Sequence, residues 1–183
     1  MSESALGQRL WNFPGGLELR HHKQVSCQRP ISDAGLPEQL FIPIGRYANA
    51  SPRLLVRPGE PVLRGQTLID SRDDFAVAVH ASTSGRFEGW VECNAAWPPG
   101  ARQRCLALRP DGLDQSVEPK PLADWAQAGP DALIDHLRAM GLSGLGGAQF
   151  PTAAKLRGDW TGIDTLILNG AECEPWIACD EML

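Results

Sequence analysis

The sequence predicts an α+β protein, in which an all-β domain is followed by the start of an α/β domain. Between residues 31 and 110, short runs of strand-forming residues alternate with turn residues, a pattern typical of a small sandwich or barrel. From residue 129 the apolar residues recur at helical spacing, and a glycine-dense loop, a short helical piece and an apolar strand follow. We therefore divide the chain into an irregular segment (1–30), a β-domain (31–110), a linker (111–128) and the first part of an α/β domain (129–183).

The composition is that of a globular protein and excludes several functions. The chain has 183 residues, of which 43% are hydrophobic and 21% charged, with a net charge of −5. An acidic balance argues against a nucleic-acid partner. No apolar run approaches the roughly 20 residues needed to span a bilayer, and the N-terminus lacks a secretory signal. The five cysteines form no C-x-x-C pair, so we expect free thiols in a cytoplasmic, reducing compartment.

The first 30 residues contain one basic group of interest. Residues 13–16 (FPGG) carry turn chemistry, and His21, His22 and Lys23 follow them. These three side chains could meet a ligand phosphate or the acidic patch of a partner. The alternative is a solvated tail that packs against a neighbouring domain.

The β-domain is predicted from short strands bounded by turn residues. Expected strands cover 40–44, 54–56, 62–63, 67–69, 75–79 and 86–91. The order PGEPVLRGQTLI, hairpin, AVHASTSGRF is similar to that of biotinyl and lipoyl carrier domains. Such carriers attach their group through a lysine at the hairpin tip, but residues 71–75 contain no lysine, so we expect neither biotin nor lipoate. His80 ends a strand and is expected to be a core residue or a turn cap.

After the linker, the sequence gives a clear helix. Pro130 suits the first helical position, and Asp131 places an acid in the first turn. One apolar face is formed by Leu133, Ile134, Leu137 and Met140. Gly141 stands where a C-terminal cap belongs, so the helix delivers the chain into the glycine loop.

The glycine loop has the composition of an anion site. Gly144, Gly146 and Gly147 let backbone N–H groups approach an oxyanion, and the short helix that follows carries Lys155 as a point charge. The loop lacks the Gly-Lys-Ser/Thr end of a Walker A motif. It also lacks a G-x-G-x-x-G pattern, because Gln149 stands where the third glycine would be.

An acidic segment follows the apolar strand predicted at 163–168. Glu172 and Glu174 would point to one side of an extended chain, where two acceptor carboxylates suit hydroxyl or amide groups. With the glycine loop, this predicts a flavin or dinucleotide site, with phosphate at the glycines and polyol at the acids. A glycine-rich helix cap and a solvated acidic loop are the alternative.

Two blocks, GLGGAQFPTAAKL and LILNGAECEPWIACDEML, resemble the RnfC (RsxC) subunit of the Rnf electron-transport complex. More distantly, they are similar to the NADH-binding flavoprotein subunit of respiratory complex I. The resemblance implies that the glycine and acidic loops bind FMN and NADH, with no general acid or base among these residues. The implied contacts are Gly144, Gly146, Gly147 and Lys155 at the FMN phosphate, Asn169 and Glu172 at the flavin, and Glu174 toward NADH. Gln149 departs from the family, which usually has glycine there, and its side chain would narrow a flavin pocket.

The same resemblance implies the architecture and the setting of the protein. The β-domain would be a barrel-sandwich hybrid without a prosthetic group. The rest of the flavin domain, a β-grasp-like domain and the cysteines of two 4Fe-4S clusters would lie outside these 183 residues, so we expect a longer subunit. It would accept hydride from NADH and bind other Rnf subunits, peripheral to the cytoplasmic face of the inner membrane. The alternative is a non-catalytic scaffold that docks membrane partners without flavin.

Overall fold

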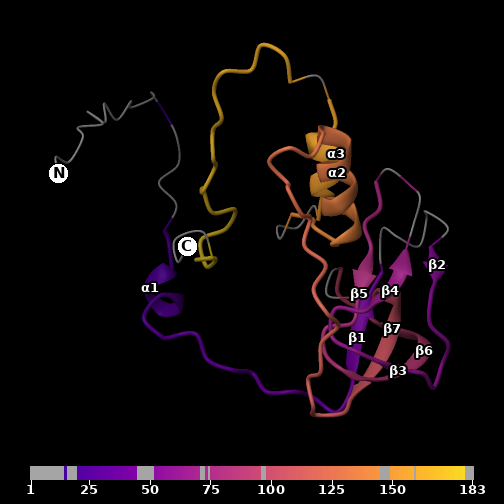
Figure 1. Cartoon of the computed structure of the whole chain (residues 1–183). Coiled ribbons are helices and arrows are strands. Elements are labelled where there is room, and N and C mark those ends of the chain that lie inside the picture. The colour runs from indigo at the N-terminus through magenta and orange to yellow at the C-terminus, as the bar shows by residue number, and fades with distance from the viewer. Residues whose placement is uncertain are drawn as a thin grey trace. The chain divides into compact units, whose positions relative to one another are not determined.

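The computed structural model describes residues 15, 20–44, 52–70, 73, 75–95, 98–144, 149–158 and 160–179. The chain divides into two compact units, which are considered separately (Figure 1). The larger unit, Ala34–Ile163, holds every strand named below together with helices α2 and α3. The smaller unit combines Met1–Asp33 with Asp164–Leu183 and contains the short helix α1.

The larger sheet of the β-domain is antiparallel and has four strands. Its order is β1-β7-β6-β3, with bounds Leu40–Pro43 (β1), Arg102–Pro110 (β7), Gly85–Asn94 (β6) and Pro61–Val62 (β3). The long β6–β7 hairpin is its centre, and a register shift between Phe87 and Gly89 marks a bulge that bends β6. β7 lies in the region predicted to be strand-rich, although none of the individually predicted strands covers it.

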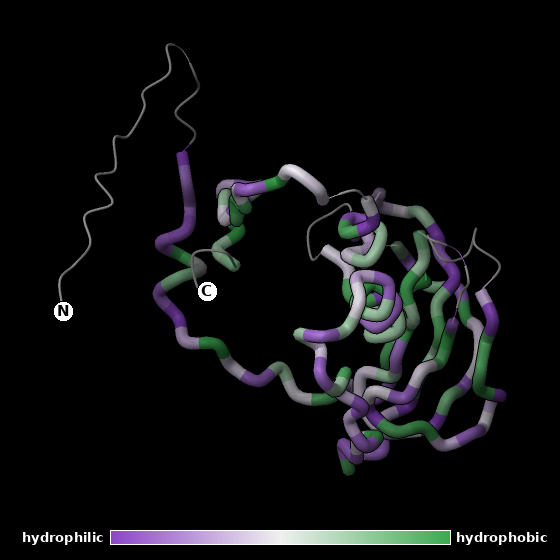
Figure 2. Tube along the Cα trace, turned by 45° about the horizontal axis from the view of Figure 1, so that its top comes forward, coloured by the Kyte–Doolittle hydropathy of each residue, from purple (hydrophilic) through white to green (hydrophobic). Residues whose placement is uncertain are grey.

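A smaller sheet of three antiparallel strands completes the β-domain. Its order is β2-β4-β5, with bounds Arg53–Leu54 (β2), Thr67–Asp70 (β4) and Val79–His80 (β5). Hydrophobic and hydrophilic residues mix along the strands of this domain (Figure 2). The buried apolar side chains form one cluster of Ile44, Val56, Val62, Leu68, Ile69, Val79, Ala81, Phe87, Leu106 and Leu108. Because β4 and β5 of one sheet and β6 and β7 of the other contribute to this cluster, the two sheets share a single core.

The strand predicted at 75–79 is wrong except at its end. Only Val79 and His80 pair as a strand, whereas Ala76, Val77 and Ala78 are buried without strand pairing. The Ala78 N–H donates instead to the Arg138 carbonyl of α2 at 3.1 Å. The alternating pattern therefore marked a buried segment that meets the end of a helix.

The first residues of the predicted linker are attached to the β-domain. The fully buried Ser84 hydroxyl donates a hydrogen bond to the Asp111 carboxylate at 2.7 Å. This bond, together with a second one from the Leu113 backbone N–H, holds the pKa of Asp111 below its ordinary value. The neighbouring Thr83 hydroxyl donates to Asp114 at 2.9 Å. Two buried polar side chains are thus satisfied by the chain that leaves β7.

Helix α2 (Pro130–Ala139) matches its prediction and ends as expected. Pro130 occupies the first turn. At the other end, the Leu142 N–H donates to the Leu137 carbonyl at 3.2 Å and the Gly141 N–H to the Arg138 carbonyl at 3.1 Å. This pair of bonds is a Schellman motif, and Gly141 supplies the positive φ of 75° that it requires.

His80 lies where α2 meets the β-domain. Burial lowers the pKa of His80, and a hydrogen bond with the Ala139 backbone partly opposes this shift. The folded state therefore favours the neutral imidazole.

The first expected result concerns this histidine. Because the folded pKa is depressed, the unfolded state binds more protons once the pH falls below the unfolded value of about 6.5. Stability should therefore fall from that pH down to the lower folded pKa. Urea unfolding at about pH 7.5 and 5.5 should show a smaller pH dependence in His80→Gln than in the parent. The exposed His21→Gln serves as the control, and an equal pH dependence in both variants would contradict the assignment.

The expectation of free thiols is wrong for two of the five cysteines. Cys93 in β6 and Cys105 in β7 are joined by a disulfide, with Cα atoms 6.5 Å apart. The register pairs Cys105 with Val91, two residues from Cys93, which brings the cysteines close on adjacent strands. Their separation of 12 residues resembles no short motif, so only strand pairing identifies them.

In the smaller unit, α1 (Lys23–Ser26) lies in a segment predicted to be irregular. The strand predicted at 163–168 is not formed, and Leu166, Ile167 and Leu168 are exposed. Among the described residues no strand pairs with this segment, and an extended chain without ladder hydrogen bonds is marginal in water.

None of the described helices is long and apolar enough to cross a membrane.

Candidate functional site

The glycine loop is closed at its base by backbone hydrogen bonds. The Gly144 N–H donates to the Phe150 carbonyl at 2.9 Å, and the Thr152 N–H donates to the Leu142 carbonyl at 3.1 Å. Ser143 and Pro151 form an antiparallel bridge between these bonds. The loop therefore leaves and re-enters the fold at one point, with the amides of its base already donating to carbonyls.

Two of the predicted phosphate ligands, Gly146 and Gly147, lie outside the described residues. Gly144 is described and exposed at the start of the loop. At its end, Gln149 has a φ of 47°, in the left-handed region that costs a residue with a Cβ more than glycine. The backbone conformation at Gln149 is thus one that favours glycine, the residue that the RnfC-like pattern has at this position.

Lys155 is carried by the short helix α3 (Thr152–Leu156), as predicted. Ala153 is buried and anchors the helix, and α3 packs against α2. Lys155 itself is exposed, and among the described residues no acidic side chain forms an ion pair with it. Its charge is therefore available to an anion near the loop.

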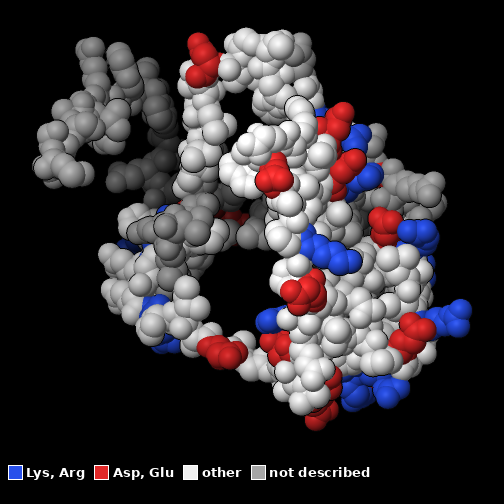
Figure 3. Space-filling model, in the orientation of Figure 1, with Lys and Arg blue, Asp and Glu red and all other residues white. Residues whose placement is uncertain are grey.

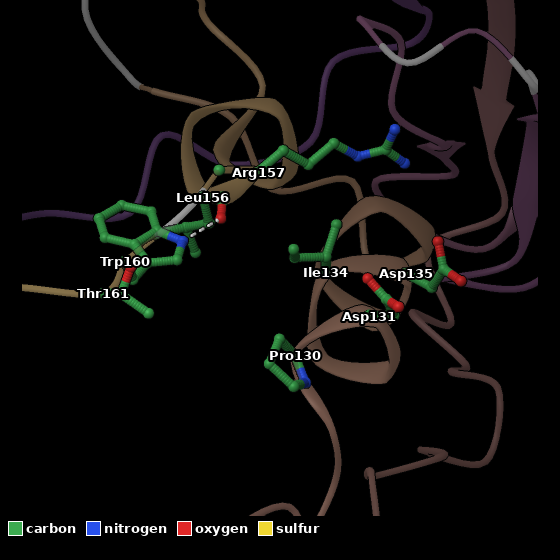
Figure 4. Close-up of a pocket in the computed structure, with 9 residues that line it drawn as sticks. Pro130, Asp131, Ile134, Asp135, Leu156, Arg157, Trp160 and Thr161 are labelled. Atoms are coloured by element: carbon green, nitrogen blue, oxygen red, sulfur yellow. Dashed lines mark hydrogen bonds between the residues drawn. The ribbon is translucent and has the colours of Figure 1, made fainter.

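A groove of about 800 Å³ lies between α2 and the chain around the end of α3 (Figure 4). It is lined by Pro130, Asp131, Ile134, Asp135, Leu156, Arg157, Gly158, Trp160 and Thr161. The Trp160 indole N–H donates to the Leu156 carbonyl at 2.8 Å, which fixes the ring at one side of the groove. None of the predicted cofactor residues that the structure describes lines it.

The acidic loop belongs to the smaller unit and is not extended. The Asn169 side chain accepts a hydrogen bond from the Ala171 N–H at 2.9 Å, which starts a turn. Only 6% of the Glu172 side chain is exposed, whereas Glu174 is exposed. The expectation that both carboxylates point to one side assumed an extended chain, and bends at Cys173 and Glu174 replace it.

The basic group near the N-terminus meets this acidic loop. Lys23 Nζ lies 4.0 Å from Glu172 Oε1. The backbone N–H of His22 donates a hydrogen bond to the Pro175 carbonyl at 2.9 Å, and the His22 and Trp176 rings stack with their centroids 4.3 Å apart. Neither segment is thus simply a solvated tail or a solvated loop. The sequence showed opposite charges in the two segments, but about 150 residues separate them.

Charges elsewhere are mixed. On the face that Figure 3 shows, acidic and basic side chains are interspersed over the larger unit. The part of the chain that the structure describes assembles no group of three or more His, Cys, Asp or Glu side chains that could hold a metal ion.

Comparison with known protein families finds two domain matches that follow one another along this chain. Residues 11–112 match the RnfC barrel sandwich hybrid domain, which covers more than half of the chain. The chain belongs to the RnfC family. Residues 137–183 match the Nuo51 FMN-binding domain, so one match contains both the glycine loop and the acidic loop. The resemblance to RnfC and the predicted fold class, with a barrel-sandwich hybrid followed by an FMN-binding type of domain, are therefore confirmed.

Curated members of the RnfC family align with almost the whole chain. The C subunit of the ion-translocating oxidoreductase complex of Edwardsiella ictaluri (strain 93-146) is 44% identical over 176 residues, covering 96% of this chain and 22% of the relative. The protein of the same name from Yersinia pestis bv. Antiqua (strain Antiqua) is 43% identical, covering 96% and 28%. That from Pasteurella multocida (strain Pm70) is 42% identical, covering 96% and 21%. The chain thus spans between 21% and 28% of the length of these relatives.

Proposed function

We propose that this chain is the N-terminal part of an electron-input subunit that accepts hydride from NADH onto FMN. Electrons would then pass through 4Fe-4S clusters in other parts of the subunit to a membrane ion-translocating complex. The observation that carries the proposal is the match of residues 137–183 to an FMN-binding domain directly after a barrel-sandwich hybrid of the RnfC type. The relatives are named as one subunit of an ion-translocating oxidoreductase complex, which agrees with this role.

Two features of the larger unit support a site for the phosphate end of FMN. Lys155 is exposed beside a loop whose base is fixed by the Gly144–Phe150 hydrogen bond. A phosphate dianion near Lys155 would gain a charge-assisted hydrogen bond, and loop amides at Gly146 and Gly147 would add neutral donors. When bound, FMN supplies the ability to accept a hydride and release electrons singly.

The acidic loop would provide acceptors for the ligand's hydroxyl and amide groups. We assign Asn169 and Glu172 to the flavin side and Glu174 to NADH. The exposure of Glu174 supports its assignment to NADH, because an exposed carboxylate can accept hydrogen bonds from the ribose hydroxyls or the carboxamide. This chain's residues would bind and orient both molecules, and none of them is required to transfer a proton.

The partners we propose are NADH and the other subunits of the Rnf complex, with the subunit peripheral to the cytoplasmic face of the inner membrane. The relatives' name supports the assembly, since it designates one member of a complex of several subunits.

Replacing Lys155 by alanine tests the phosphate assignment. In the full-length subunit, Lys155→Ala should weaken FMN binding by roughly 1.5–3 kcal/mol, the worth of a hydrogen bond to a charged group. Titration of FMN fluorescence measures this affinity. Lys120→Ala, which removes an exposed lysine from the linker, is the matched control. Equal affinities in the two variants would contradict the assignment.

The second candidate function is a scaffold in which the barrel-sandwich hybrid docks membrane partners without flavin. It is favoured by Gln149, whose side chain stands at a left-handed position beside the glycine loop. The absorbance of purified full-length subunit after incubation with FMN separates the two functions. Bound flavin supports the electron-input role, and its absence at saturating FMN supports the scaffold.

A further inference from the structure

We propose that His22 and Lys23 are positioning residues that clamp the acidic loop at 172–176. Both segments belong to the smaller unit. Figure 1 shows α1 beside the C-terminal segment, and the contacts between His22, Lys23 and the loop make them neighbours in space.

Three different kinds of contact join the two segments. A backbone hydrogen bond of 2.9 Å runs from His22 to Pro175. The imidazole of His22 stacks on the indole of Trp176, with centroids 4.3 Å apart and planes 15° from parallel. Lys23 Nζ and Glu172 Oε1 form an ion pair at 4.0 Å. Two adjacent residues thus contact three positions of the loop, which fixes the loop's orientation as well as its distance.

The ion pair gives Glu172 a structural part in the loop. Its side chain is 6% exposed, and a carboxylate so far removed from water is unstable without a cation or hydrogen-bond donors. Lys23, itself 25% exposed, supplies the cation, and the Cys179 thiol lies 3.5 Å from the other carboxylate oxygen. Glu172 therefore anchors the loop from within, whereas the exposed Glu174 faces outward.

His22 and Lys23, the two clamp residues, are themselves held in place by the hydrogen bonds of α1. His22 is the N-cap of α1, its carbonyl accepts the Val25 N–H at 3.1 Å, and the Lys23 carbonyl accepts the Cys27 N–H at 2.8 Å. The two clamp residues therefore sit on a hydrogen-bonded turn. Such a turn holds their side chains in register with the loop, as a free tail would not.

The clamp divides the roles of the two glutamates, and this part rests on the proposed function. Glu172, in addition to its assigned contact at the flavin side, would hold the loop through Lys23, and Glu174 would contact NADH. Loss of the clamp would leave Glu174 in place along the chain but free the loop to reorient, which lowers ligand affinity without removing a ligand contact.

Amide hydrogen exchange of the full-length subunit, without added ligand, tests the clamp. Exchange in residues 171–177 should become about tenfold faster in His22→Ala and in Lys23→Gln, since each removes a contact of the size that aromatic or ion pairs contribute. His21→Ala and Lys120→Gln are matched controls at exposed positions and should leave it unchanged. Protection of the β6–β7 hairpin in the same samples reports that the variants are folded.

The charge exchange Lys23→Glu with Glu172→Lys is the second variant. It should restore at least half of the protection lost in Lys23→Glu alone, as a specific ion pair requires. Unchanged exchange in both His22→Ala and Lys23→Gln would overturn the clamp. Failure of the charge exchange to restore protection would overturn the ion-pair part.

Ligand titration distinguishes the clamp from the proposed function. Glu174→Gln should weaken NADH binding without altering exchange in 171–177, whereas Glu172→Gln should alter both. If no variant or parent binds FMN or NADH, the proposed function fails, while the exchange data still decide whether the clamp exists.

Discussion

Replacing Phe87 by alanine is expected to lower the free energy of unfolding of the β-domain by about 3–5 kcal/mol. Phe87 has the largest of the fully buried side chains, with 0% of its surface exposed. It lies in β6 opposite Leu108 of β7, inside the core that both sheets share. Truncation therefore removes the aromatic ring and leaves a cavity that two sheets must close. A loss of this size is a large fraction of the roughly 5–15 kcal/mol that stabilises a typical native protein.

The matched control is Phe75→Ala, which removes the same atoms from a side chain that is 66% exposed. Phe75 makes one edge contact with Phe150, with centroids 6.2 Å apart, so its loss should cost no more than about 1.5 kcal/mol. Urea denaturation followed by circular dichroism gives both values. If the two variants lose equal stability, Phe87 is not at the centre of the core.

Replacing Gly141 by alanine is expected to cost about 2–5 kcal/mol and to detach the end of α2 from the β-domain. Gly141 has a φ of 75°, and a Cβ there would lie 2.6 Å from the Ala78 carbonyl oxygen and 3.1 Å from His80 Nδ1. The first of these atoms is backbone, so the overlap cannot be relieved by a rotamer change. The Ala78–Arg138 hydrogen bond and the contact of His80 with Ala139 lie at this junction and should be lost together.

Gly112→Ala separates the overlap from the cost of the backbone angle. Gly112 has nearly the same φ, 77°, but a Cβ there meets nothing within 4 Å. It should therefore cost only the roughly 1–2 kcal/mol of a left-handed residue. Denaturation of both variants, with hydrogen exchange of residues 76–80, measures the difference. Equal losses, with exchange at 76–80 unchanged, would contradict close packing at Gly141.

The consequence for function lies in how the glycine loop is held. α2 leads directly into this loop, and the loop base is pinned by hydrogen bonds from Gly144 and Thr152. A shift of α2 would therefore move the proposed phosphate site with it. We infer that the barrel-sandwich hybrid supports the position of the glycine loop through its contact with α2.

Local signals in the sequence predicted the elements whose geometry is local. Pro130 and Gly141 marked the two ends of α2, because a fixed φ suits a helix start and a positive φ suits its Schellman cap. Alternation and turn residues located β1, β3 and β4 to within a few residues. The glycine and acidic blocks indicated the family, because both motifs can be recognised from their residues alone, without knowing which contacts they make.

Other predictions failed where a distant segment decides the outcome. Residues 163–168 have the composition of a strand, but a strand exists only when its N–H and C=O groups find a partner. Residues 75–78 alternate like a strand, but α2 takes the hydrogen bond from Ala78. Cys93 and Cys105 lie in no recognisable motif, and only the β6–β7 register makes them a pair.

The sequence by itself determined the fold class, the ends of α2, the short helix that carries Lys155 and the membership of the RnfC family. The tertiary structure alone decided that His22 and Lys23 meet the acidic loop, that Glu172 is buried while Glu174 is exposed, and that Gly141 lies against Ala78. The physical reason is the range of the interactions. Backbone angles and helical periodicity act over a few residues and are written in the local sequence. Burial and ion pairing depend on which remote surfaces meet, and no local pattern specifies that.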